Sequence, residues 1–202
     1  MQPIQTKGDK AQTRRDQIIS AAITCFRRSG FHGAGMAEIA RHAELSVGQI
    51  YRYFTKKDAI IEEIVRRIVD KKIQLLMLML EEKDPHSLMA HALTTQSLND
   101  DLIHDDDKAL TLEVTAEATR NPRVSDILQE ADAKLFHQAV TLLQRRYPQC
   151  SPESIAARVE FMAVLSEGTT FRSVLPQKAP IATLTQLYQH IFQLTFPEDN
   201  YS

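Results

Sequence analysis

The nine residues Ser46-Val47-Gly48-Gln49-Ile50-Tyr51-Arg52-Tyr53-Phe54 decide the fold, and residues 34–57 around them predict a helix-turn-helix. At about 100° per residue, Val47, Ile50 and Phe54 share one side of a helix and are expected to bury. Tyr51 lies at the margin. The opposite side carries Gly48, Gln49, Arg52 and Tyr53. A face with a cation, an amide and phenols is suited to base edges and phosphate oxygens.

Charge is distributed unevenly along the chain. Residues 1–57 hold ten Lys or Arg against four Asp or Glu, a net charge of +6. The remainder holds fourteen basic and twenty-two acidic residues, a net of −8, and the two segments sum to the −2 of the whole chain. Because attraction to a polyanion is local, a basic first quarter on an acidic body indicates a nucleic-acid partner.

The basic segment resembles the DNA-binding domain of the tetracycline-repressor (TetR) family. The residues that carry the resemblance are Thr13-Arg14, Ile18, Ala21-Ala22, Phe26, Gly30-Phe31, Ile39-Ala40, Ala43, Ser46, Gly48, Ile50-Tyr51, Phe54 and Lys57-Asp58. So many positions at fixed spacing make a specific signal over roughly the first 60 residues. The resemblance implies a homodimeric transcriptional regulator, usually a repressor, that a small molecule releases from its operator on double-stranded DNA.

Nine residues are expected to form the DNA-binding surface: Thr13, Arg14, Ser46, Gly48, Gln49, Tyr51, Arg52, Tyr53 and Lys57. The resemblance implies phosphate contacts for the Thr13-Arg14 turn, both tyrosines and Lys57. Arg52 is the expected reader of guanine, and Gln49 is a candidate reader of adenine. Ser46 is the expected N-cap, which makes Gln49 its capping-box partner. The Gln49 side chain is therefore expected either to cap the helix or to contact a base.

Two positions depart from the family pattern. Glu44 stands in the turn where Gly is usual, and a left-handed conformation there would cost about 1–2 kcal/mol. Gly35 stands at the start of the first motif helix where Ser or Thr is usual, and Gly is an N-cap only a few tenths of a kcal/mol worse. Neither departure is expected to break the motif.

Six Gly, no Trp and few alternating β-branched runs favour an all-helical fold. Residues 1–56 are expected to form a three-helix DNA-binding domain, and residues 57–202 a helical domain for effector binding and dimerisation. Thr13 and Asp16, spaced like a capping box, are expected to begin the first helix. About nine helices are predicted, at residues 13–28, 36–43, 47–54, 57–81, 86–100, 106–120, 123–147, 152–174 and 180–196.

Several features indicate a cytoplasmic protein without a membrane partner. The longest apolar run, residues 73–80, is far shorter than the ~18–20 residues that span a bilayer, and the N-terminus lacks a signal-peptide pattern. Cys25 and Cys150 form no motif, and Cys25 is expected to be an ordinary core thiol. Seven scattered histidines form no Cys/His pair at metal spacing, so no metal site is expected. The sequence has no nucleophile elbow, phosphate loop or paired-acid constellation, so no cofactor or catalytic site is expected either.

An internal, mostly apolar effector pocket is expected among helices 57–81, 86–100, 106–120 and 123–147. Its candidate lining residues are Met77, Met89, Glu113 and Glu117. The two glutamates are spaced i, i+4. They either neutralise a cationic ligand or pair with Arg120 and Arg123, and the pairing is favoured. The identity of the effector is not predicted.

The last two helices are apolar on more than one side, which indicates a partner unless they are simply well buried. The resemblance implies a dimer interface of four helices, two from each subunit. The expected interface residues are Val159, Gly168, Leu184, Leu187 and Ile191. The sequence therefore predicts a ligand-responsive regulator, with a DNA-organising helix-turn-helix protein that senses no ligand as the alternative.

Overall fold

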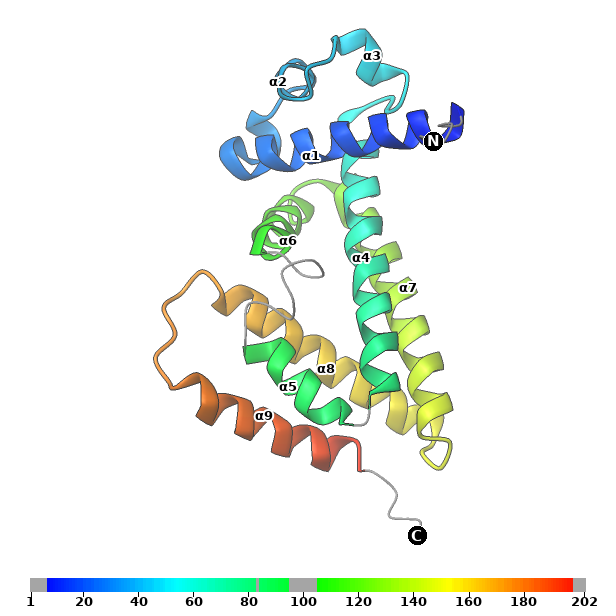
Figure 1. Cartoon of the computed structure of the whole chain (residues 1–202), viewed down its shortest axis with the longest axis vertical. Coiled ribbons are helices and arrows are strands. Elements are labelled where there is room, and N and C mark those ends of the chain that lie inside the picture. The colour runs from blue at the N-terminus through cyan, green and yellow to red at the C-terminus, as the bar shows by residue number, and fades with distance from the viewer. Residues whose placement is uncertain (1–6, 83, 95–104, 198–202) are drawn as a thin grey trace, which may run out of the picture. The chain divides into compact units, whose positions relative to one another are not determined.

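The computed structural model describes residues 7–82, 84–94 and 105–197, which contain nine α-helices and no strand. The all-helical prediction is confirmed (Figure 1). The helices are α1 Lys7–Gly33, α2 Met36–His42, α3 Val47–Tyr51, α4 Lys57–Glu81, α5 Pro85–Thr94, α6 Asp105–Ala118, α7 Pro122–Arg146, α8 Pro152–Arg172 and α9 Ile181–Thr195. Part of the predicted helix 86–100 lies outside the described residues. No described helix is long and apolar enough to cross a membrane.

The chain packs as two units. The first combines the chain up to Arg67 with Glu113–Leu128, and the second combines Ile68–Leu112 with the chain from Gln129 onward. Helices α4, α6 and α7 therefore each contribute residues to both units. The boundary between the two packed units falls inside α4, after Arg67. The division into a DNA-binding domain (residues 1–56) and an effector-binding and dimerisation domain (residues 57–202) concerns function and stays a prediction.

The first unit is built on α1, which packs against α2, and α2 packs against α3. Helix α1 begins at Lys7, so the capping box predicted at Thr13 and Asp16 is wrong. Its regular path breaks at Gly30, where φ is +67° and the chain turns toward α2. The unit's largest fully buried side chains include Phe26, Ile18, Ile39, Ile50, Ile60, Ile61 and Ile64.

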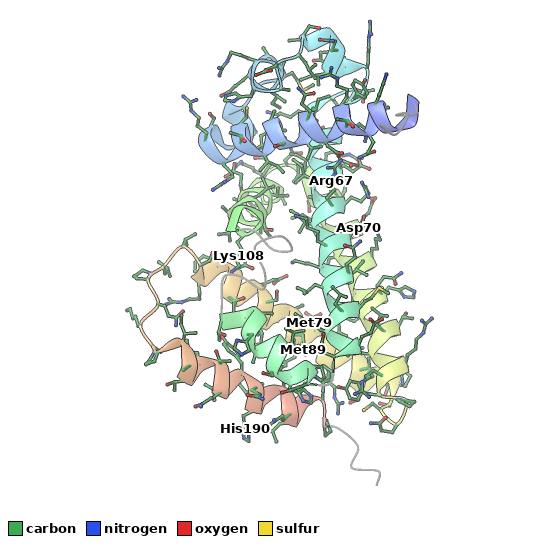
Figure 2. All side chains as sticks on the ribbon, viewed as in Figure 1. Arg67, Asp70, Met79, Met89, Lys108 and His190 are labelled. Carbon is green, nitrogen blue, oxygen red and sulfur yellow. The ribbon has the colours of Figure 1, made fainter. Side chains whose placement is uncertain are left out.

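The second unit has two apolar clusters of buried side chains. One joins α7, α8 and the residue that ends α9: Ala139, Leu143, Tyr147, Ile155, Val159 and Phe196. The other joins α4, α5 and α9: Met79, Met89, Ala90 and Phe192. Figure 2 labels both methionines of the second cluster, and Figure 1 shows α5 lying along α9. A 2.7 Å hydrogen bond between the hydroxyls of Thr94 and Thr185 also links α5 to α9.

Candidate nucleic-acid interface

The recognition helix α3 is short and capped at its start as predicted. The Ser46 hydroxyl accepts a hydrogen bond from the Gln49 backbone N–H at 3.2 Å. The Gln49 side-chain oxygen accepts one from the Ser46 N–H at 2.8 Å, which completes the capping box. This reciprocal pair satisfies two N–H groups that a helix start leaves without partners. In the DNA-free protein Gln49 therefore acts as a cap.

The turn between α2 and α3 is held in a fixed conformation. Glu44 has φ +53° and is the only non-glycine residue with positive φ in the described parts of the chain. The Leu45 N–H donates to the Ala40 carbonyl at 2.9 Å, and the Gln17 side-chain amide donates to the Ala43 carbonyl at 2.6 Å. The left-handed conformation considered for Glu44 is thus confirmed, as is the N-cap position of Gly35.

The outer surface of α3 presents groups that can meet DNA. Tyr51 is 49% exposed, and Gly48 has open space where a Cβ would lie. Arg52, the residue that ends α3, is exposed, and its guanidinium has no hydrogen bond or ion pair to any residue the structure describes. Such a group can donate two parallel hydrogen bonds to guanine or to a phosphate.

Two predictions about α3 need correction. The helix ends at Tyr51 rather than at residue 54, so Tyr53 belongs to the following turn and Phe54 to the segment after it. Val47 was expected to bury, but it is 37% exposed because it is the first helical residue and reaches beyond the core. Ile50 and Phe54 are buried as predicted.

The other predicted DNA contacts occupy different environments. Thr13 and Arg14 are exposed on α1, where Arg14 donates to the side chain of Gln17 at 2.6 Å. Tyr53 is half-buried, and its carbonyl accepts a hydrogen bond from Arg15 at 3.1 Å. Thr13, Arg14 and Tyr53 remain predicted DNA contacts. Arg15 itself lies 4.5 Å from the centre of the Phe54 ring, so it supports the fold.

The structure argues against the phosphate contact predicted for Lys57. Its Nζ donates to the carbonyls of Phe31 at 2.7 Å and Ala34 at 3.2 Å, and it lies 4.3 Å from the centre of the Phe31 ring. Burial lowers the pKa of Lys57, although the charges of Glu117 and Asp58 oppose that shift. Lys57 therefore ties the start of α4 to the end of α1.

The predicted effector residues belong to different units, Glu113 and Glu117 to the first and Met77 and Met89 to the second. Met89 belongs to the core shared by α5 and α9, whereas Met77 is 46% exposed. Glu113 accepts a hydrogen bond from the Phe31 N–H, and the buried Glu117 pairs with Arg120 at 2.9 Å. These contacts correct the idea that the two glutamates receive a cationic ligand. The favoured pairing holds for Arg120.

The predicted pairing of Arg123 with Glu113 or Glu117 is wrong. Its Nη2 lies 3.4 Å from the carboxylate of Glu62, on the first turns of α4. Arg123 is the second residue of α7, whereas Arg120 follows the end of α6, and the two side chains pair with different glutamates. The sequence could not identify this partner because Glu62 is 61 positions away and only the packing of α7 against α4 brings the two side chains together.

The predicted dimer residues divide into two groups. Val159 is buried in the core of its own unit, so the prediction that it lies in a dimer interface is wrong. Gly168 and Leu187 are exposed, and Leu184 and Ile191 are half-buried. At about 100° per residue, Val159 lies on the side of α8 opposite to Phe161. The exposed apolar positions of α8 are Phe161, Val164 and Phe171.

One cluster in the first unit was not anticipated from the sequence. Cys25 of α1 lies beside Glu38 and His42 of α2, with one ligating atom from each within 4.8 Å of the others. Burial and then the charge of Glu38 raise the pKa of the Cys25 thiol. The i, i+4 spacing of Glu38 and His42 was a visible signal, but the position of Cys25 depends on how α1 packs against α2.

The capped helix α3, the fixed turn before it and the exposed Arg52 define a helix-turn-helix DNA-binding protein. Residues 18–64 match the family model of the bacterial regulatory proteins of the tetR family. The HTH-type transcriptional regulator BetI of Serratia proteamaculans is 27% identical over 164 residues, which cover 80% of this chain and 81% of that protein.

Solved structures share the fold. GusR of Salmonella enterica aligns with a TM-score of 0.69 at 18% identity, covering 94% of this chain and 97% of that one. FadR of Bacillus subtilis in complex with stearoyl-CoA aligns with a TM-score of 0.65 at 17% identity, covering 87% and 96%. Residues 18–64 thus match the family of bacterial regulatory proteins of the tetR type, and the chain as a whole is similar to transcriptional regulators, which are not enzymes.

Proposed function

We propose that the protein is a repressor that binds a near-palindromic operator as a homodimer and is released by a small molecule. The observation that carries this proposal is an apolar stripe on α8, formed by Phe161, Val164, Gly168, Phe171 and the nearby Leu175. These positions repeat at intervals of three and four residues, so they share one side of the helix. Large contiguous apolar patches on a surface mark interaction sites.

A second copy of the chain is the proposed occupant of this stripe. Helix α9 adds exposed apolar side chains of its own at Ile181, Leu187 and Leu194. A two-fold axis lets the same patch serve both subunits, and two-fold symmetry is the commonest arrangement of homo-oligomers. Two recognition helices related by such an axis would read two half-sites, which explains why the operator is expected to be near-palindromic.

Release by a ligand requires a path from the second unit to the first. Helices α4, α6 and α7 supply that path, because each contributes residues to both units. FadR of Bacillus subtilis, which shares the fold, was solved with stearoyl-CoA bound, and this supports a ligand for the present chain without naming it. A near-complete switch requires the ligand to prefer the released state by about 5.5 kcal/mol.

The alternative is a DNA-organising protein that responds to no ligand. The experiment that separates the two begins by selecting genomic fragments that the full-length chain binds, and locating the shared sequence within them. The selected operator is then screened against a compound library for release. Arg52→Ala, at the exposed residue that ends α3, is the control that should enrich the same operator less than the wild-type chain does.

The repressor proposal expects one discrete operator and at least one class of compound that lowers occupancy. Binding spread evenly over unrelated fragments, with no compound that changes it, would favour the DNA-organising alternative. A regulator of this kind would act on DNA in the cytoplasm, where its operator and its small-molecule effector are both present.

A further inference from the structure

We propose that Cys25, Glu38 and His42 form a binding site for a divalent transition metal of the Zn²⁺ class, placed between α1 and α2. The ligating atoms of the three side chains all lie within 4.8 Å of one another. Cys25 is buried, while Glu38 and His42 are half-buried on successive turns of α2. The site is therefore anchored on the core side and accessible on the other.

The geometry suits a tetrahedral ion. Zn²⁺ binds sulfur at about 2.3 Å and nitrogen or oxygen at about 2.0–2.2 Å, so its ligands lie roughly 3.3–3.7 Å apart. The present separations close to that range when Glu38 and His42 rotate, which half-buried side chains at a helix surface can do. Three protein ligands leave a fourth position for water.

The donor set selects the class of metal. A thiolate and an imidazole favour Zn²⁺, Co²⁺ or Cu⁺ over Mg²⁺ and Ca²⁺, which prefer oxygen ligands. The thiolate of Cys25 and the carboxylate of Glu38 together carry two negative charges, which balance a divalent cation at a buried position. Binding displaces the thiol proton to solvent and forms the metal–sulfur bond.

One neighbouring cation must move. The Nη2 atom of Arg41 lies 3.1 Å from Nε2 of His42, and because a guanidinium only donates, the lone pair of that nitrogen faces Arg41. Arg41 is exposed, so it can leave His42 without loss of buried contacts. The metal then replaces a weak surface contact with a bridge between α1 and α2.

The test uses the untagged full-length chain, reduced and metal-free, titrated with Co²⁺ as a spectroscopic probe. The proposal expects one equivalent to bind with a thiolate-to-metal charge-transfer band. His42→Gln, on the accessible side, should weaken Co²⁺ binding at least about tenfold, and Cys25→Ser should abolish the band. Zn²⁺ should raise the thermal midpoint of the wild-type chain and raise that of His42→Gln less at the same Zn²⁺ concentration.

Cys150→Ser is the matched control, because Cys150 is the other cysteine and lies in the second unit beside Arg158. The band should survive this substitution. Absence of the band in the wild-type chain would overturn the proposal, as would a band that disappears with Cys150 or persists in both Cys25→Ser and His42→Gln. None of these results bears on operator binding, so the two proposals are tested separately.

Discussion

The backbone N–H of Phe31 donates a hydrogen bond to Oε1 of Glu113, 2.6 Å away and 82 positions later in the chain. Phe31 follows Gly30, whose φ of +67° turns the end of α1, and a Cβ at Gly30 would lie only 3.1 Å from the same oxygen. The close approach of the Glu113 carboxylate therefore requires a residue without a Cβ at position 30. Helix α6 is anchored in this way to the helix that supports the recognition motif.

Glu117, one turn further along α6, strengthens the anchor. It is fully buried, and its carboxylate lies 3.0 Å from His32, 2.9 Å from Arg120 and 3.0 Å from the Asn121 amide. Burying a carboxylate costs free energy unless such partners surround it. Together with the bond from Phe31 to Glu113, these contacts hold the C-terminal half of α6 against the end of α1 within the first unit.

Glu117→Ala should therefore destabilise the protein. The change removes a buried acceptor of three contacts, and the expected loss in the free energy of unfolding is about 1–3 kcal/mol. Urea denaturation at neutral pH measures it. Glu62→Ala is the matched control, because Glu62 pairs with Arg123 at the surface and should change stability by less than about 1 kcal/mol. Equal effects of the two substitutions would contradict the anchor.

Glu63 predicts how stability responds to acid. Burial alone would raise the pKa of Glu63, but hydrogen bonds from Arg66 and Arg67 outweigh burial and lower it. As the pH falls below about 4.3, the ordinary glutamate pKa, the unfolded chain takes up the proton before the folded one does. Stability is therefore lost as the pH falls through this window, and is fully present above it.

Glu63→Gln should remove this acid-dependent part. The urea midpoint of the wild-type chain should fall more steeply between pH 7 and about pH 3.5 than that of the variant. Glu62→Gln, which alters the exposed neighbour, should retain the wild-type slope. The comparison is between slopes of the urea midpoint against pH. A pH-independent loss of stability, caused by Arg66 and Arg67 losing their charged partner, does not change such a slope. Parallel curves for wild type and Glu63→Gln would exclude the predicted role.

Much of the local structure was predictable from the sequence because it depends on neighbours in the chain. Ser46 and Gln49 are three residues apart in one helix, and the capping box follows from their side-chain chemistry. Glu44 stands where the turn requires a left-handed residue, and the structure gives it φ +53°. Such features do not depend on how distant segments pack.

The roles of Lys57 and Val159 were not predictable in the same way. Lys57 lies 26 positions from Phe31, and only the packed domain brings its ammonium to that carbonyl. Val159 and Phe161 are both apolar on α8, and the sequence cannot say which side faces the subunit's own core. Which side chains contact one another across the fold depends on tertiary packing, and the residue pattern of a single helix does not reveal it.

The turn before α3 offers a stabilising substitution. Glu44 in its left-handed conformation costs about 1–2 kcal/mol, which Gly avoids. The greater freedom of Gly in the unfolded chain offsets about 0.4–1 kcal/mol of that gain. Glu44→Gly should therefore raise the free energy of unfolding by about 0.5–1 kcal/mol. Glu44→Ala removes the charge but keeps the strain, so a matching gain in that control would assign the effect to charge.

Arg52 and Lys57 should affect DNA binding differently. Arg52→Ala should weaken operator affinity by about 1–3 kcal/mol with little change in stability, since its guanidinium is exposed. Lys57→Ala should lower the thermal midpoint, because its ammonium is hydrogen-bonded to two carbonyls, and should leave the salt slope of binding unchanged. Fluorescence anisotropy over a salt series measures both. If the salt slope of Lys57→Ala is smaller by about one unit, Lys57 contacts a phosphate after all.

The last prediction concerns subunit association. Leu187 is 55% exposed on α9, away from the buried Phe192, so a charge there leaves the subunit's core intact but prevents an apolar surface from packing. Leu187→Asp should yield a folded monomer that binds a single half-site weakly, because the second recognition helix no longer lies roughly 34–36 Å away on the same DNA. Sedimentation equilibrium measures the mass, and circular dichroism measures the helix content.

Gln193→Asp adds the same charge at an exposed polar position of α9 and should remain a dimer. If Leu187→Asp stays a dimer with full operator affinity, or if the wild-type chain is a monomer at micromolar concentration, the α8–α9 interface is wrong.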